Sequence, residues 1–268
     1  MHDDRFDRLP APSLPPRLIT VGSSLFETST EREFMGAKTG LLAYAEGEIA
    51  QALRRASEPS TEETVTMIGR LYPGHHVERT DDSSLGEEIH PPEGITYAAS
   101  LPGVDIVCDR RFMIDHPSRL PAHLIEASAG RRLVLHAMHS VVDWLAFAVW
   151  ENGRLVRSLS LSPDSGILEN IGRPFPFEAP YWAGEHPVDP DPSREDEEPY
   201  PLPFHPLELG EEALRALFGF VVEGMPGPDD VDPDDVGLCG FRLTESTGSE
   251  PADEKTDPEA AVRATEHS

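Results

Sequence analysis

The clearest pattern in the chain is a pair of apolar runs on either side of Asn152-Gly153. Asn-Gly between runs rich in β-branched and aromatic residues predicts a β-hairpin with a two-residue type I′ turn. Such a turn sets the register, so Trp144 is expected opposite Leu161 and Trp150 opposite Leu155. Alternation along a strand then places both tryptophans on one face. Both faces are apolar near the turn, which predicts a hairpin inside a sheet that helices cover.

Shorter periodic segments surround the hairpin. Apolar runs predict strands at Lys38–Ala45, Ile95–Ser100, Val104–Cys108 and Arg131–Met138, and suggest a last edge strand at Gly240–Leu243. Amphipathic patterns and capping residues predict helices at Glu48–Ala56, from Ser60 to Pro73, at Ser118–Ala129 and at Glu211–Glu223. Strands and helices do not alternate strictly. The expected fold is therefore a single α+β domain, with a mixed β-sheet around a central hairpin at Trp144–Ser162 and helices packed on it.

The boundaries of this domain are expected where the composition changes. Residues 1–34 are rich in Pro, Ser, Thr and charge, and residues 244–268 are polar and acidic, so both ends are expected to be disordered. The domain itself is expected at 35–243, and Met35 is an alternative start of the polypeptide. Pro187–Pro203 reads as an extended acidic loop. Leu18–Phe26 is too short and too interrupted to predict a signal peptide or a membrane span.

The charge of the protein narrows the classes of partner. Its 49 acidic and 22 basic side chains give a formal net charge of −27. Such a charge disfavours nucleic acid and anionic membrane surfaces, whose phosphates need clustered Lys and Arg. The simplest interpretation of this charge is that it keeps the protein soluble and lies partly in acidic tails. The more specific alternative is that the protein binds a basic partner protein. Cys108 and Cys239 lie too far apart in sequence for a disulfide framework, which favours the reducing cytoplasm.

Four residues are weak candidates for catalysis: Cys108, His136, His139 and Arg157. Cys108 precedes two arginines that would favour a thiolate, although a small buried residue is the simpler interpretation. His136 and His139 would share a face on a helix, but on the predicted strand they point to opposite faces. No metal or other cofactor is therefore expected. Arg157 is expected on the Trp144 face, where it must reach solvent or an acid, either Glu178 or Asp143.

An aromatic, proline-rich loop follows the predicted sheet. Its candidate binding residues are Phe175, Phe177, Glu178, Tyr181 and Trp182. They could line a pocket or a partner surface. The preferred interpretation is a flap that covers the core, since long ordered loops serve packing as often as function.

Long strings of the sequence bear a resemblance to a known family. They include MGAKTGLLAYAEG, LPGVDIVCDRRFM, SRLPAHLIEASAGRRLVLHAMHSVVDWLAFAVWENGRLVRSLSLSPDSG, PFEAPYWAGEHPV, PYPLPFHPLELGEEALRALFGF and DDVDPDDVGLCGFRL. Over about Met35 to Leu243 the protein resembles an uncharacterised family of soluble actinobacterial proteins, classed as a domain of unknown function. The resemblance implies a single bacterial domain and adds nothing about its function.

Two functions fit these observations. The first is a non-enzymatic cytoplasmic domain for protein interaction or regulation, which uses the acidic surface and the aromatic loop. The second is a hydrolase-like enzyme with a Cys, His and Arg constellation. The first is favoured, because the sequence shows no convergent catalytic set. A single cavity lined by Cys108, a histidine and an arginine would favour the second.

Overall fold

The structure is a computed structural model that describes residues 37–55, 58–188 and 199–245. The predictions of disorder for residues 1–34 and for most of 244–268 therefore lie outside the described residues, as does the centre of the Pro187–Pro203 loop. The described residues all belong to the compact unit that begins at Gly36.

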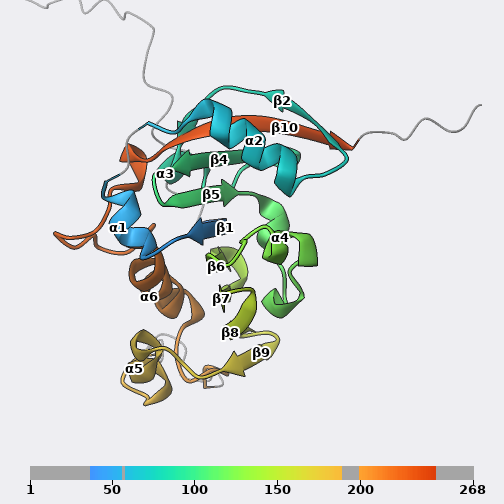
Figure 1. Cartoon of the computed structure of the whole chain (residues 1–268). Helices are drawn as coiled ribbons and strands as arrows, with labels where there is room; N and C mark the ends of the chain where they lie inside the picture. The colour runs from blue at the N-terminus through green and yellow to red at the C-terminus, as the bar shows by residue number, and fades with distance from the viewer. Residues whose placement is uncertain (1–36, 56–57, 189–198, 246–268) are drawn as a thin grey trace, which may run out of the picture. The chain divides into compact units, whose positions relative to one another are not determined.

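The described residues form one sheet. Its strands are β1 (Lys38–Ala45), β2 (His75–Arg79), β3 (Ser83–Ser84), β4 (Ile95–Leu101), β5 (Val104–Cys108), β6 (Arg132–His139), β7 (Trp144–Glu151), β8 (Arg154–Ser162), β9 (Gly166–Gly172) and β10 (Gly237–Glu245). They make a 10-stranded sheet in the order β2-β10-β4-β5-β1-β6-β7-β8-β9 (Figure 1). The short strand β3 pairs with β10 beside this path. Every pairing is antiparallel.

This topology corrects three expectations about the sheet. It is antiparallel and not mixed. Short links make β4–β5 and the run from β6 to β9 antiparallel, and the neighbours that are distant in sequence, such as β1–β5 and β2–β10, are antiparallel as well. The β7–β8 hairpin lies toward the β9 side, and β1 holds the middle of the order. The C-terminal strand β10 is not an edge strand, because it lies between β2 and β4. Strand β9 was missed because Gly166–Gly172 has little apolar periodicity.

Helices pack on both faces of the sheet. They are α1 (Ile49–Leu53), α2 (Thr61–Leu71), α3 (Leu85–Glu88), α4 (Ala122–Glu126), α5 (Ala179–Trp182) and α6 (Pro206–Phe218). Buried residues of α1, α3, α5 and α6 join one hydrophobic cluster, and those of α2 and α4 join the cluster on the opposite face. Helices α1 and α6 lie side by side (Figure 1). A core on each face explains why β1 and β7 are nearly continuous apolar runs.

The hairpin turn forms as predicted. Asn152 and Gly153 have positive φ angles of 52° and 74°, as a type I′ turn requires. Next to the turn, Trp150 pairs with Leu155. The register then shifts between Val149 and Trp150, so Val149 faces Arg157.

This β-bulge adds one residue to β8 and turns every later side chain to the other face. The expected pairing of Trp144 with Leu161 is therefore wrong, because Leu145 pairs with Leu161. Leu159 and Leu161 pack with Phe147 in the α6-side cluster. Trp144 and Trp150 still share a face, as predicted, and they are only 7% and 2% exposed in the opposite cluster.

Three helices differ in extent from their prediction. The expected helix Ser118–Ala129 is a 3₁₀ turn at Pro117–Arg119 followed by α4, because Leu120 is extended (ψ 134°) before Pro121. The expected helix Glu211–Glu223 is α6, which ends before Gly219 in the left-handed conformation at φ 85°. Helix α1 stops at Leu53, short of the predicted end. Helix α2 begins as predicted, with Ser60 Oγ accepting from the Glu63 N–H at 3.4 Å.

Candidate functional site

The predicted thiol and imidazole lie on one face of the sheet but do not meet. Cys108 and His136 each pair with Leu41 of β1, which runs between their strands. Two strand spacings separate them, about 10 Å. A thiol and its base must lie within hydrogen-bond reach for proton transfer, and Leu41 occupies the space between.

The environment of Cys108 also disfavours a thiolate. The side chain is fully buried. Burial raises the pKa of its thiol far above the ordinary value, and the charges of Asp109 and Glu88 act in the same direction. A reactive cysteine needs the opposite shift. Cys108 is therefore placed as a core residue.

His136 is bound on both ring nitrogens. Nδ1 lies 2.9 Å from Thr39 Oγ1, and Nε2 lies 3.0 Å from the Gly210 carbonyl. A carbonyl only accepts, so Nε2 carries the proton and Nδ1 accepts from the threonine hydroxyl. Burial lowers the pKa of His136 to about 4, against the hydrogen bond to Gly210, which raises it. The ring is thus a neutral link between β6 and α6.

His139 lies on the other face of the sheet, as the strand periodicity predicted. Its Nδ1 accepts from the Val141 N–H at 3.3 Å. Within the described ranges, no three His, Cys, Asp or Glu side chains gather as metal ligands. The two histidines therefore cannot share a ligand.

Arg157 is fully buried and fully paired. Its Nε donates to Glu178 Oε1 at 2.9 Å and its Nη2 to Oε2 at 2.6 Å. Its Nη1 donates to Asn170 Oδ1 at 2.6 Å and to backbone carbonyls of the same region. The bulge places Arg157 on the Phe147 face, so the expected Trp144 face is wrong. Glu178 as its acid is confirmed. Asp143, the other acid considered, instead lies 3.6 Å from His205 Nε2.

The aromatic loop lies on the core. Phe177 packs on Phe147 with ring centroids 5.9 Å apart, and Trp182 packs on Phe204 at 5.0 Å. Trp182 Nε1 donates to the buried Glu178 at 3.3 Å. Tyr181 is buried, and Phe175 and Phe177 are partly buried against the α6-side cluster. Through these contacts, the aromatic loop covers the core.

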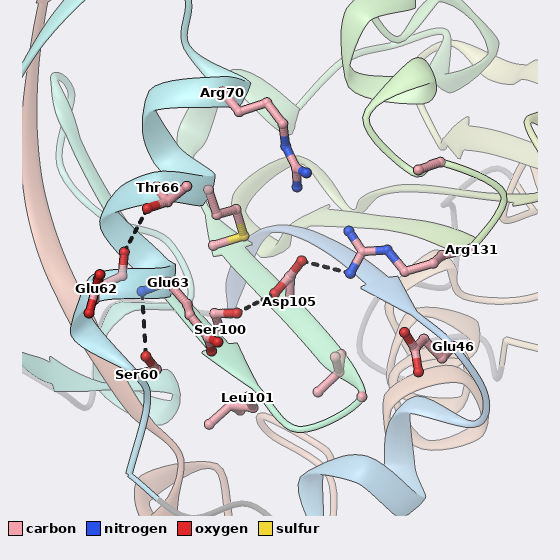
Figure 2. A pocket seen from close by; sticks show the side chains of 14 residues that line it. Glu46, Ser60, Glu62, Glu63, Thr66, Arg70, Ser100, Leu101, Asp105 and Arg131 are labelled. Atoms are coloured by element: carbon pink, nitrogen blue, oxygen red, sulfur yellow. Dashed lines mark hydrogen bonds and ion pairs between the residues drawn. The ribbon is translucent and has the colours of Figure 1, made fainter.

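A polar groove lies elsewhere, beside α2. Its volume is about 790 Å³. It is lined by Glu46, Ser60, Glu62, Glu63, Thr66, Met67, Arg70, Ser100, Leu101, Gly103, Val104, Asp105, Ala129 and Arg131. These residues come from α2 and its N-cap, from the β4–β5 hairpin, and from the segments that follow β1 and precede β6 (Figure 2).

The floor of the groove is held by an ion pair. Arg131 Nη1 lies 2.7 Å from Asp105 Oδ2, and Ser100 Oγ donates to Asp105 Oδ1 at 2.7 Å. The Ser100 N–H donates to Thr64 Oγ1 at 2.9 Å, which ties β4 to α2. Asp105 is only 8% exposed, so this network gives the groove a fixed polar base.

The groove also presents charges that make no ion pair with the part of the chain that the structure describes. Arg70 is exposed and makes no ion pair within residues 37–55, 58–188 and 199–245. In Figure 2 its side chain extends from α2 toward the space above Asp105 and Arg131. Burial raises the pKa of the nearby Tyr44, and the charges of Arg131 and Arg70 both lower it, which places the two guanidinium groups near one ring.

Three carboxylates complete the groove. Glu46, Glu62 and Glu63 are exposed, and none of them forms an ion pair with the described part of the protein. The Glu63 N–H also takes part in the cap of α2, where it donates to Ser60 Oγ. The groove itself was not predicted. No sequence signal could have found it, because its residues come from four separate segments.

The fold and the groove define a class of protein: an antiparallel sheet with a core on each face and a polar groove at one helix. The sequence model of a protein family, described as "Family of unknown function (DUF6928)", matches residues 39–241. The protein therefore belongs to this family, as the resemblance predicted. No curated protein matches it, and no solved structure does. In the described segments, no helix has both the length and the apolar character to cross a membrane.

Proposed function

We propose that the protein is a non-enzymatic interaction domain whose polar groove receives a segment of a partner protein. The observation that carries this proposal is the groove itself, with a fixed Asp105–Arg131 base and charges of both signs that make no ion pair with the described residues. A fixed polar base with satisfied hydrogen bonds orients a ligand without reorganising.

The charges specify the chemistry of that segment. Glu46, Glu62 and Glu63 favour Lys or Arg side chains, and Arg70 favours a carboxylate. The net charge of −27 attracts basic partners over long range and repels nucleic acid. The segment we propose is therefore basic and has one carboxylate, such as the free C-terminus of a polypeptide.

The hydrolase alternative has less support. Its thiol is buried, its imidazole is bound on both nitrogens, and its arginine is occupied by Glu178. The aromatic loop is also a weaker binding surface than the groove, because its side chains already pack on the core.

We further propose that the domain works in the bacterial cytoplasm. Cys108 and Cys239 are free and buried, in clusters on opposite faces of the sheet. Two buried thiols that cannot reach one another are compatible with a reducing compartment.

The test is a fluorescence anisotropy titration with short synthetic peptides. A Lys- and Arg-containing peptide with a free C-terminal carboxylate is compared with its C-terminal amide. We expect the free carboxylate to bind more tightly, and binding to weaken as salt is raised. Arg70→Gln should remove the difference between the two peptides. Glu62→Gln combined with Glu63→Gln should weaken both.

Glu78→Gln is the matched control, since Glu78 is an exposed acid on β2 outside the groove. It should leave both affinities unchanged. If Glu78→Gln weakens binding about half as much as the Glu62→Gln and Glu63→Gln double variant, which removes two charges, net charge alone explains the attraction and the groove is refuted as the site.

A further inference from the structure

A second, smaller pocket lies between the end of α2 and α4. Its volume is about 200 Å³, and it shares no lining residue with the polar groove. It is lined by Leu71, Tyr72, Pro73, His75, Arg111, Phe112, Leu120, Pro121, His123 and Leu124. Most of these side chains are apolar or aromatic. An apolar cavity of about 150 Å³ can hold benzene, so this pocket has room for one ring and a small substituent.

One polar group of the pocket is the guanidinium of Arg111. Its Nε and Nη2 donate to Asp109, and its central carbon lies 4.4 Å from the centroid of the Tyr72 ring. Its Nη1 has no hydrogen-bond partner in the described ranges. Arg111 is therefore fixed in orientation and keeps free donors.

The second polar group is His75. Its Nδ1 is buried and, among the residues that the structure describes, has no hydrogen-bond partner. The ring packs edge-on to Tyr72, with centroids 6.0 Å apart. A buried polar atom without a partner costs stability, and a ligand group that bonds to it recovers that cost. The neighbouring His123 is already engaged, since its Nε2 lies 3.2 Å from the Leu71 carbonyl.

The charge balance selects a neutral ligand. Burial raises the pKa of Asp109, but hydrogen bonds from Arg111 and Thr96 outweigh burial and hold the pKa below its usual range. Asp109 is therefore ionised and already balances the charge of Arg111. A ligand carboxylate would add a second negative charge beside Asp109 without a free cation to match it.

We propose that this pocket binds a small neutral molecule made of one apolar ring and a carboxamide-like group. The ring occupies the space between Leu120 and Leu124. The amide oxygen accepts from Arg111 Nη1, and the amide N–H donates to His75 Nδ1. The site is independent of the groove and of the proposed partner.

The test is an NMR titration of the full-length protein with three probes of similar size: benzamide, benzoate and toluene. Benzamide should bind at millimolar concentration or below and shift the ring signals of Tyr72 and His75. Benzoate should bind about tenfold more weakly, because it carries the extra charge and lacks the N–H donor. Toluene reports on the apolar space alone.

Two variants separate the pocket from its polar groups. Leu124→Phe fills the space and should abolish binding of benzamide and toluene, whereas Val65→Phe on the exposed side of α2 should change neither. Arg111→Lys keeps a cation beside Asp109 but removes Nη1. It should weaken benzamide about tenfold and leave toluene unchanged.

Three results would overturn the proposal. They are the absence of benzamide binding at millimolar concentrations, equal affinity for benzamide and benzoate, and benzamide shifts that Leu124→Phe leaves unchanged in a folded protein. If Leu124→Phe does not fold, Arg111→Lys decides alone, and unchanged benzamide affinity refutes the proposal.

Discussion

Two arginine–carboxylate pairs of this protein have different roles. The side chains of Arg157 and Glu178 are 0% exposed, and their remaining polar atoms bind Asn170, Phe175 and Trp182. The side chains of Arg131 and Asp105 are 22% and 11% exposed, beside Arg70, which has no ion-pair partner among the described residues. The first pair has no atom left for a ligand and acts as a clamp. The second pair forms the floor of a groove that still presents free charge.

These two pairs show how an ion pair that only stabilises the fold differs from one that belongs to a binding site. Burial is not the criterion, since the most buried arginine is the one with the least binding capacity. The criterion is whether donors and acceptors remain after the protein's own bonds are counted. The following predictions test it, from the largest expected effect to the smallest.

Glu178→Ala should be the most damaging change. It leaves Arg157 buried without its counter-charge and frees the aromatic segment that covers the core. Breaking a buried pair on one side costs about 3–5 kcal/mol. Urea unfolding should show this loss against wild type. A loss similar to that of an exposed pair would contradict the clamp.

The core histidine should make stability fall in acid. His136 has a pKa near 4 in the folded state and an ordinary value near 6.5. The unfolded protein therefore binds the proton first, and folding stability drops as pH falls from about 6.5 toward 4. The full shift corresponds to roughly 3 kcal/mol. Urea melts across this range should show the drop.

The variant His136→Asn is the control for the acid effect. Its dependence on pH between 6.5 and 4 should be shallower than that of wild type, since the titrating ring is gone. If the stability of the two proteins falls equally steeply with pH, the loss of stability in acid comes from other titrating groups.

Asp105→Ala should have an intermediate effect. It removes hydrogen bonds from Ser100 and Arg131, but solvent still reaches Arg131. Losing hydrogen bonds to a charged group costs about 1–3 kcal/mol. Thermal melts should place this variant between wild type and Glu178→Ala. It should also weaken peptide binding, because the floor of the groove is lost.

Arg70→Gln should have the smallest effect on stability. Arg70 makes no ion pair with the described residues, and surface changes of this kind are usually within about 0.5 kcal/mol. Its melting temperature should match that of wild type while peptide selectivity is lost. A large loss of stability would show that Arg70 stabilises the fold, and it would weaken the proposal that the groove is a binding site.

Much of the local structure could be read from the sequence. The strand at Lys38–Ala45, the turn at Asn152-Gly153 and the cap at Ser60 follow from short-range rules, and the structure has each of them. The pairing of Arg157 with an acid followed from the cost of an unpaired buried charge. Strand parity correctly placed His136 and His139 on opposite faces.

The errors have a common physical source. The bulge at Val149/Trp150 moved Leu159 and Leu161 to the other face, because one inserted residue inverts a period of two. The place of β10 inside the sheet depends on pairing with β2 and β4, which lie far away in the sequence. Neither event leaves a local pattern.

The sequence by itself determined most of the elements, because periodicity, caps and turns act over a few residues. It also determined the strong negative charge, which disfavours partners that are themselves negatively charged. Only the tertiary structure decided which polar residues use their hydrogen-bonding groups within the fold and which keep some of these groups for a ligand. Cys108 and Arg157 became core residues, whereas Arg70 and Arg111 kept donors that no described residue accepts from. That difference depends on neighbours brought together from distant segments, so no stretch of sequence contains it.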